Sequence, residues 1–208
     1  MRELVIIGAG GLGREIAWVA QEIAEYENLE VLGFIDDNKS LWDSEINGLR
    51  VLGGRDWLRG RENVYAVLGI GDPRVKREVV GHLGRYVRWA TLIHPNAHVS
   101  QFNHFGEGTV VFPGSAVTTN VKTGEHALIY LGCTVGHEVI IGNYVTLLPG
   151  CNVGGSTCIK DGVLVGSGSN IIQGMKVGAW SKVGAGAVVI NDVPSESTVV
   201  GVPAEVVR

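Results

Sequence analysis

The stretch LIYLGCTVGHEVIIGNYVTL, residues 128–147, has an aliphatic residue at every sixth position, from Ile129 to Leu147. The same period runs from residue 93 to residue 189, where sixteen of the seventeen positions are apolar and Thr123 is the exception. Glycine recurs one place after many of these positions. A six-residue period fits neither an α-helix nor a hairpin meander, whereas it is typical of a parallel β-helix with short strands and glycine-rich corners.

Three such hexads form one triangular coil of 18 residues, and each coil advances the axis by about 4.8 Å, the ordinary spacing between strands. Residues 18 apart therefore face each other in adjacent coils. Cys133 and Cys151 have this separation and are expected to stack in the interior. Because the three cysteines, with Cys158 the third, have no zinc or redox spacing, we expect them to be reduced thiols that serve as small core residues.

The first 90 residues follow a different pattern, in which apolar runs alternate with helix-like segments. The expected elements are strands over residues 4–7, 29–35 and 64–70, a helix over residues 11–26, and a second helix that begins at Asp72-Pro73. This alternation is typical of a small parallel α/β unit. We therefore predict a Rossmann-like α/β half domain over residues 1–90 and a parallel β-helix over residues 91–208.

Composition and charge narrow the choice of partners. Charged residues make up 18% of the chain and the net charge is −4, which argues against nucleic acid or an anionic membrane as a partner. The first apolar run, residues 4–7, is too short for a signal sequence or a membrane span. We therefore expect a cytoplasmic protein that binds neither nucleic acid nor membrane.

A glycine-rich turn, Gly8-Ala9-Gly10-Gly11-Leu12-Gly13, follows the first expected strand and opens the first expected helix. Such a turn can bind phosphate with backbone N–H groups. Asp36 stands where an NAD-binding fold has its ribose acceptor, yet about 90 residues supply only half of a dinucleotide-binding fold. A mononucleotide-sized ligand is therefore favoured. In the alternative interpretation, Gly8 and Gly13 serve only the packing of strand against helix.

The whole chain resembles the hexapeptide-repeat sugar O/N-acyltransferases, and it is most similar to the branch that includes sialic acid O-acetyltransferases and bacterial UDP-4-amino-sugar N-acetyltransferases. The resemblance rests on the hexad repeat and on residues 7–14, 33–37 and 201–204. It implies a left-handed β-helix and a homotrimer that binds acetyl-CoA between neighbouring β-helices. It also implies a nucleotide-linked amino sugar as the acetyl acceptor, held by the N-terminal domain.

The resemblance assigns the residues of the site as well. It implies His137 as the general base and Glu138 as its partner, and a histidine can accept a proton at neutral pH. The implied substrate-binding residues are Gly10, Gly11, Leu12, Asp36, Asp37 and Gly71. The implied acetyl-CoA-binding residues are Thr146, Gly155, Ser167 and Ala185. Leu12 and Thr146 depart from the family pattern, which often has histidine at both positions.

Other functions stay open at this point. One rival is O-acetylation of a sialic-acid-like sugar, and another is a non-catalytic scaffold that binds a sugar nucleotide. A zinc-dependent β-helix hydratase would need converging histidines, which within one subunit implies spacings near 18 or 36 residues or a shared corner. The remaining candidates, His94, His98, His104 and His126, contain no pair with a spacing of 18 or 36. We therefore expect no metal, and we expect direct transfer without a cysteine nucleophile.

Overall fold

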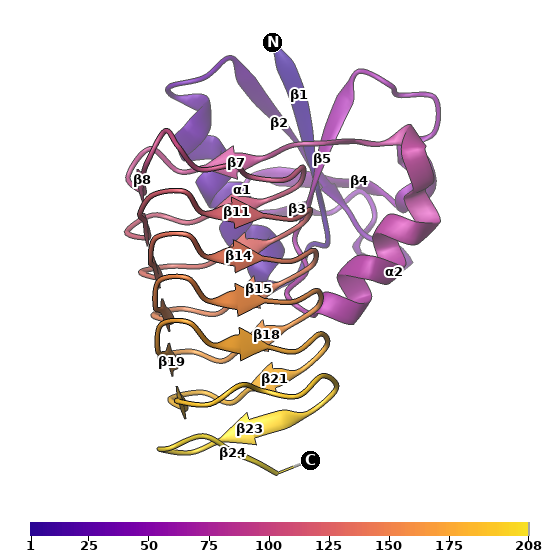
Figure 1. The fold of residues 1–208 in the computed structure, drawn as a ribbon. Coiled ribbons are helices and arrows are strands. Elements are labelled where there is room, and N and C mark those ends of the chain that lie inside the picture. The colour runs from indigo at the N-terminus through magenta and orange to yellow at the C-terminus, as the bar shows by residue number, and fades with distance from the viewer. Residues whose placement is uncertain (208) are drawn as a thin grey trace.

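The computed structural model describes residues 1–207 and consists of an α/β part followed by a three-sided β-helix (Figure 1). The elements of the first part are β1 (Arg2–Ile7), α1 (Gly11–Ala24), β2 (Leu29–Ile35), the 3₁₀ helix η1 (Lys39–Leu41), β3 (Glu45–Ile46), β4 (Leu49–Gly53), the 3₁₀ helix η2 (Arg55–Leu58), β5 (Val64–Leu68), α2 (Pro73–Leu83), the 3₁₀ helix η3 (Gly84–Tyr86) and β6 (Arg88–Trp89).

The sheet of the first part has the strand order β3-β4-β2-β1-β5-β6. Strand β1 lies near the centre and pairs in parallel with β2 and β5, while β3 and β4 form an antiparallel pair. Side chains alternate between the two faces of a strand. Leu4 and Ile6 accordingly pack in the same cluster as α1, whereas Val5 and Ile7 pack with Val79 of α2. The two helices thus cover opposite faces of the sheet.

The helix starts confirm the sequence predictions. The carboxylate of Asp72 accepts hydrogen bonds from the backbone N–H groups of Arg74 and Val75, at 2.8 and 3.1 Å, and Pro73 is the first residue of α2. Strand β2 has the predicted bounds, whereas β5 ends two residues earlier than predicted. Strands β3, β4 and β6 were not predicted, since β3 and β6 contain only two residues each and β4 ends in glycine.

The β-helix has three faces of short strands. The first face contains β8 (His98–Val99), β10 (Ala116–Val117), β13 (Thr134–Val135), β16 (Asn152–Val153), β19 (Asn170–Ile171) and β22 (Val188–Val189). The second face contains β11 (Lys122–Thr123), β14 (Ile140–Ile141), β17 (Cys158–Ile159) and β20 (Lys176–Val177). The third face contains β7 (Leu92–Ile93), β9 (Val110–Val111), β12 (Leu128–Ile129), β15 (Thr146–Leu147), β18 (Leu164–Val165), β21 (Lys182–Val183), β23 (Thr198–Val200) and β24 (Glu205–Val206).

The predicted 18-residue register is confirmed, because Thr134 pairs in parallel with Asn152, and Asn152 with Asn170. Within the described part of the β-helix, only the last strand, β24, runs antiparallel to its neighbour, and it closes the end of the coil. The apolar sixth residues of the hexads are buried almost throughout. The polar exception, Thr123, is also buried, and its hydroxyl accepts a hydrogen bond from the backbone N–H of Gly106 at 3.1 Å.

The cysteines behave largely as predicted. All three are free thiols, and Cys133 and Cys151 are fully buried in adjacent coils. Hydrogen bonding with Cys151, together with burial, raises the pKa of the Cys133 thiol. Cys158 lies on a strand of the second face and is half-buried, so it is less enclosed than a core residue.

The two parts of the chain are joined through buried polar contacts. Lys76 of α2 is 2% exposed, and its ammonium donates to the backbone carbonyls of His126 and Val145 in the β-helix, at 2.8 and 3.1 Å. On the other side, Glu22 of α1 lies 2.5 Å from the Nε2 atom of the buried His94. These contacts fix both helices of the first part against the β-helix.

Burial sets the protonation of the groups at this junction. It lowers the pKa of Lys76 to about 7, and it lowers the pKa of His126 to about 4, with the charge of Lys76 as the second cause. Trp89 packs edge-on against the His126 ring and Tyr144 stacks on it. Within residues 1–207, no helix has the length and apolarity that a membrane span requires.

Replacement of Lys76 by methionine should reveal this buried charge. The folded-state pKa is about 7 and the ordinary value is 10.5, so between these pH values the unfolded chain holds a proton that the folded chain has released. Stability of the unmodified protein should therefore rise with pH across this window, by up to about 5 kcal/mol from this group. Lys76→Met should remove that rise.

The measurement is the free energy of unfolding in urea at several pH values from 6.5 to 10.5. Lys122→Met, at an exposed lysine on β11, serves as the control and should keep the pH dependence of the unmodified protein. Equal slopes in the Lys76 and Lys122 variants would show that Lys76 is not buried as a titrating group.

Candidate active site

His137 and Glu138 occupy the corner between β13 and β14. Their side chains are 59% and 62% exposed, and the Nδ1 atom of His137 lies 3.5 Å from the Oε2 atom of Glu138. A carboxylate beside Nδ1 favours the tautomer that carries its proton there. The lone pair of the neutral ring then resides on Nε2, which makes that atom the base.

The next coil provides the surface on which the imidazole rests. Residue 155 follows His137 by 18 positions and is a buried glycine. A Cβ atom at Gly155 would lie only 2.6 Å from Nε2 and 2.7 Å from Cε1 of His137. Such distances are far below ordinary van der Waals contact, so the ring can hold this position only above glycine. The predicted acetyl-CoA residue Gly155 therefore lies directly beside the predicted base.

Glu138 has an unusual backbone conformation. Its φ is 59°, in the left-handed region that L-residues other than asparagine and glycine rarely adopt. Asn120 and Ser156, one coil to either side, have φ values of 59° and 55°, and Gly174 has 77°. A non-glycine residue in this region costs on the order of 1 kcal/mol. The same region is occupied at other corners of the coil, for example by Tyr144 and Trp180, so the Glu138 backbone follows the pattern of the fold.

The other predicted acetyl-CoA residues lie away from His137 in the same chain. Ser167 and Ala185 are exposed and stacked at the corner that follows β18 and β21, where the backbone N–H of Gly186 donates to the carbonyl of Ser167 at 2.8 Å. The corner with His137 and Gly155 follows the first face instead. One chain thus brings Ser167 to Ala185 and His137 to Gly155, but it does not join these two pairs in one place.

The glycine-rich turn contains two kinds of glycine. A Cβ atom at Gly13 would lie 1.9 Å from the carbonyl oxygen of Gly8, and Gly8 itself has a φ of 103°. These two glycines are therefore required for the packing of strand against helix. No atom lies within 4 Å of a Cβ placed at Gly10 or Gly11, so packing does not require glycine at either position. The open space in front of Gly10 and Gly11 suits a ligand that approaches the backbone.

The start of α1 can accept an anion. Gly10 is the N-cap residue, no side chain caps the helix, and the first turn contains no acidic residue. The first N–H groups of a helix lack partners within it and carry a partial positive charge. Local backbone donors thus exist for a phosphate group, in a chain whose net charge is −4.

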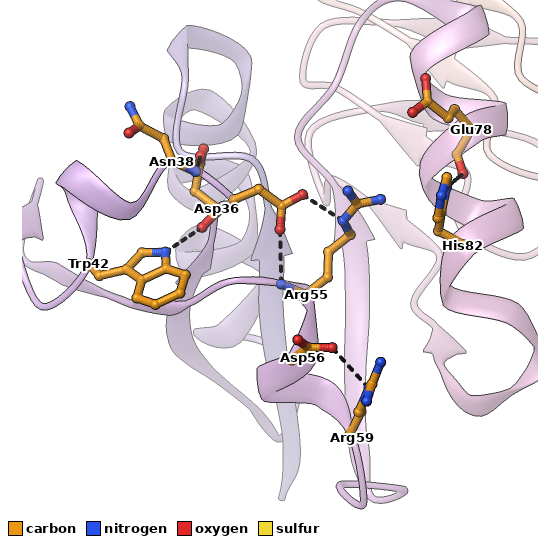
Figure 2. Close-up of polar contacts among 9 residues, drawn as sticks. Asp36, Asn38, Trp42, Arg55, Asp56, Arg59, Glu78 and His82 are labelled. Atoms are coloured by element: carbon orange, nitrogen blue, oxygen red, sulfur yellow. Dashed lines mark hydrogen bonds and ion pairs between the residues drawn. The ribbon is translucent and has the colours of Figure 1, made fainter.

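The two aspartates, of which Figure 2 labels Asp36, organise the loops around this turn. The carboxylate of Asp36 accepts from the backbone N–H groups of Ala9 and Asn38, at 2.9 and 2.8 Å. Asp37 pairs with the Nε atom of Arg55 at 2.6 Å and accepts from its backbone N–H at 3.1 Å. Asp36 is therefore linked directly to the glycine-rich turn, and Asp37 to the loop after β4.

Leu12, Gly71 and Thr146 converge at the junction of the two parts. The hydroxyl of Thr146 donates to the carbonyl of Gly71 at 2.8 Å, and a Cδ atom of Leu12 lies 3.5 Å from a Cβ placed at Gly71. Thr146 itself is fully buried. The two positions that depart from the family pattern are thus both neighbours of Gly71, although they are 134 residues apart in sequence.

A cavity of about 730 Å³ extends from the Asp37 loop toward the C-terminal end of α2. Its lining includes Trp42, Arg55 and Tyr86. The indole of Trp42 donates to the backbone carbonyl of Asp36 at 2.8 Å, and Figure 2 shows Arg55 between this loop and α2. Sequence reasoning missed Trp42 and Arg55. Two features of the sequence could have pointed to them: Trp42 is a tryptophan in a polar segment, and Arg55 directly follows Gly53-Gly54.

The four other histidines that the sequence singled out lie apart from this chemistry. His94 and His126 are buried at the junction of the two parts, where they contact Glu22 and Tyr144. His98 lies on β8, and His104 forms a bridge with Lys122. Among residues 1–207, no group of three or more histidine, cysteine, aspartate or glutamate side chains is arranged to bind a metal ion.

Comparisons with known proteins find matches for both parts of the chain. Residues 3–83 match the family model of the PglD N-terminal domain. The acetyltransferase domain of PglB from Neisseria gonorrhoeae has a TM-score of 0.92 and 29% identity, with 100% of each chain covered. A search of curated protein sequences found no match.

Two further solved structures have nearly the same coverage. One is a perosamine N-acetyltransferase from Caulobacter crescentus, a histidine-to-asparagine variant in complex with CoA and GDP-perosamine, with a TM-score of 0.90, 27% identity, and 98% and 96% of the two chains covered. The other is WeeI from Acinetobacter baumannii, with a TM-score of 0.89, 27% identity, and 98% and 99% covered. These matches confirm the left-handed β-helix behind a Rossmann-like domain. Over nearly its whole length the chain is thus similar to solved sugar acetyltransferases, which supports the resemblance to hexapeptide-repeat sugar acyltransferases that its sequence shows.

Proposed function

We propose that the chain transfers an acetyl group from acetyl-CoA to the amino group of a nucleotide-linked amino sugar. The observation that carries this proposal is the His137–Glu138 pair, whose imidazole rests on Gly155 at an exposed corner. The solved relatives support the substrates. One PglB acetyltransferase structure contains acetyl coenzyme A, and the perosamine N-acetyltransferase contains CoA and GDP-perosamine.

The transfer needs a general base, and it needs no acyl-enzyme intermediate. The amine nitrogen attacks the thioester carbonyl while Nε2 of His137 takes its proton, which raises the nucleophilicity of the nitrogen. The C–N bond forms, the C–S bond breaks, and the CoA thiolate leaves and is protonated. Cys133 and Cys151 are fully buried in the coil interior, which disfavours either as an acyl carrier.

The nucleotide sugar belongs to the N-terminal part in this proposal. Its phosphates lie at Gly10 and Gly11, where the helix start offers N–H donors and the space is open. The nucleobase or the sugar hydroxyls lie toward Asp36 and Asp37, because carboxylates repel phosphate. Transfer to a hydroxyl of a sialic-acid-like sugar is the rival, and the relatives named as N-acetyltransferases favour the amine.

The proposed active form is a homotrimer with acetyl-CoA between neighbouring β-helices. The placement of the predicted acetyl-CoA residues supports it, since Ser167 and Ala185 lie at a different corner from His137 and Gly155. A neighbouring copy would bring the second corner to the first. The cytoplasmic location stays a prediction from the sequence.

Replacement of His137 by alanine tests the base. We expect kcat to fall by roughly 10²–10⁴-fold, the usual effect of losing a general base, with little change in stability because the side chain is exposed. The assay follows CoA release with a panel of nucleotide amino sugars. His98→Ala, at an exposed histidine on β8, is the matched control and should keep its activity. An unchanged kcat in the His137 variant would remove this residue from the mechanism.

Replacement of Gly11 by aspartate tests the nucleotide site. No atom crowds a side chain at this position, and an acidic residue in the first helical turn stabilises a helix by about 0.3–1 kcal/mol. Folding should therefore survive, while the added charge should abolish binding of the nucleotide sugar and leave CoA binding intact. Gly11→Asn adds the same bulk without charge and should bind more tightly than Gly11→Asp. Calorimetry measures the binding of nucleotide sugar and of CoA to each variant. Tight binding of NAD(H) in place of a nucleotide sugar would contradict the assignment of this site.

Mixing two inactive variants tests the shared site. His137→Ala lacks the base, and Ser167→Trp should block the neighbouring corner. If each site takes His137 from one subunit and Ser167 from the next, random trimers of the two variants should regain about one quarter of the sites. Sedimentation should show a trimer for each variant. No recovery after mixing and refolding, with trimers present, would refute a site built between subunits.

A further inference from the structure

A positioning role for Ser156 follows from the stacking of the coils. The corner with His137 and Glu138 lies directly above Gly155 and Ser156, because successive coils are in an 18-residue register. The backbone N–H of Ser156 donates to the carbonyl of His137 at 2.7 Å. The backbone of the two corners is thus locked together, and the side chain of Ser156 projects beside that of Glu138.

The hydroxyl of Ser156 reaches the carboxylate that faces the base. It donates to Oε2 of Glu138 at 3.2 Å, and the same oxygen lies 3.5 Å from Nδ1 of His137. Glu138 is 62% exposed and its long side chain has many rotamers in water. A carboxylate that moved freely would not hold the imidazole in one tautomer. The hydroxyl selects the rotamer that places Oε2 against Nδ1.

The backbone at Ser156 accepts a change to glycine or asparagine. Serine has a φ of 55° there, and glycine or asparagine would adopt this region with less strain. Gly174 occupies the equivalent corner of the next coil and Asn120 that of the coil before Glu138. Positive φ values recur at other corners of the coil, for example at Tyr144 and Trp180, so the inference rests on the contact that the Ser156 side chain makes.

We infer that Ser156 is a positioning residue, which holds the Glu138 carboxylate against Nδ1 of His137 and so keeps Nε2 free as the base. The inference rests on the proposed function, because it assigns Ser156 a part in that transfer. Ser156 acts through Glu138 and is not placed in contact with either substrate.

Ser156→Gly removes the hydroxyl and suits the backbone, so the fold should be kept. We expect about a 5- to 20-fold loss of kcat, near the lower end for a hydrogen bond to a charged group because this one is exposed, with the KM for acetyl-CoA and the melting temperature unchanged. Ser156→Asn restores a donor in a residue that tolerates this backbone and should recover most of the activity. Asn120→Gly, at the matching corner of an earlier coil, is the control and should behave as the unmodified protein.

A double-mutant cycle separates positioning from a general structural effect. In a Glu138→Ala background, Ser156→Gly should cost less than about a further twofold, because its partner is already absent. The same loss in both backgrounds, or no loss in either, would overturn the inference.

One readout does not depend on activity. In ¹⁵N NMR of the imidazoles, assigned with the His137→Ala variant, His137 should show one tautomer in the unmodified protein and a mixture in Ser156→Gly. An unchanged tautomer would overturn the inference. If the unmodified protein transfers acetyl to no nucleotide amino sugar, the proposed function fails, and this spectrum still decides on Ser156.

Discussion

The backbone hydrogen bonds between coils are the constraint on which the rest of the structure depends. Short strands pair in parallel with the strand 18 residues later, and this ladder follows each of the three faces. A shift of one residue would turn the aliphatic ladder outward, so the register is strongly specified. Every corner residue consequently has a fixed partner above and below it. In a loop, the position of such a residue would depend on side-chain packing. Here the hydrogen bonds of the main chain determine it.

This register explains which corner positions near His137 are restricted in the side chain that they can carry. The backbone hydrogen bonds between coils fix His137 above Gly155, where any side chain would collide with the imidazole. It also fixes Glu138 above Ser156, where a small hydroxyl meets a carboxylate. The chemistry of the pair therefore depends on four residues in two adjacent coils. A change at residue 155 or 156 acts on the base as directly as a change in the base's own neighbours.

The sequence revealed the periodic features and missed those that depend on distant contacts. Hexads, helix caps and the glycine-rich turn are local patterns, so the fold class, α2 and the His137 corner could be predicted. Sequence alone could not separate the packing role of Gly13 from the open position of Gly11, since that difference depends on the carbonyl of Gly8. Nor could it find Arg55 beside Asp37, because an ion pair between residues 18 apart, on either side of two short strands, leaves no pattern.

The same coil connects the two proposed sites. Thr146 follows His137 by nine residues, half a coil, and its hydroxyl holds the carbonyl of Gly71 at the edge of the proposed nucleotide-sugar site. Next to it, the carbonyl of Val145 accepts from Lys76, which projects from α2 four residues after Asp72. The N-terminal part is thus attached to the coil that carries the base, through groups shielded from water. Because a buried polar contact is costly to break, the distance from the glycine-rich turn to His137 is fixed by the fold.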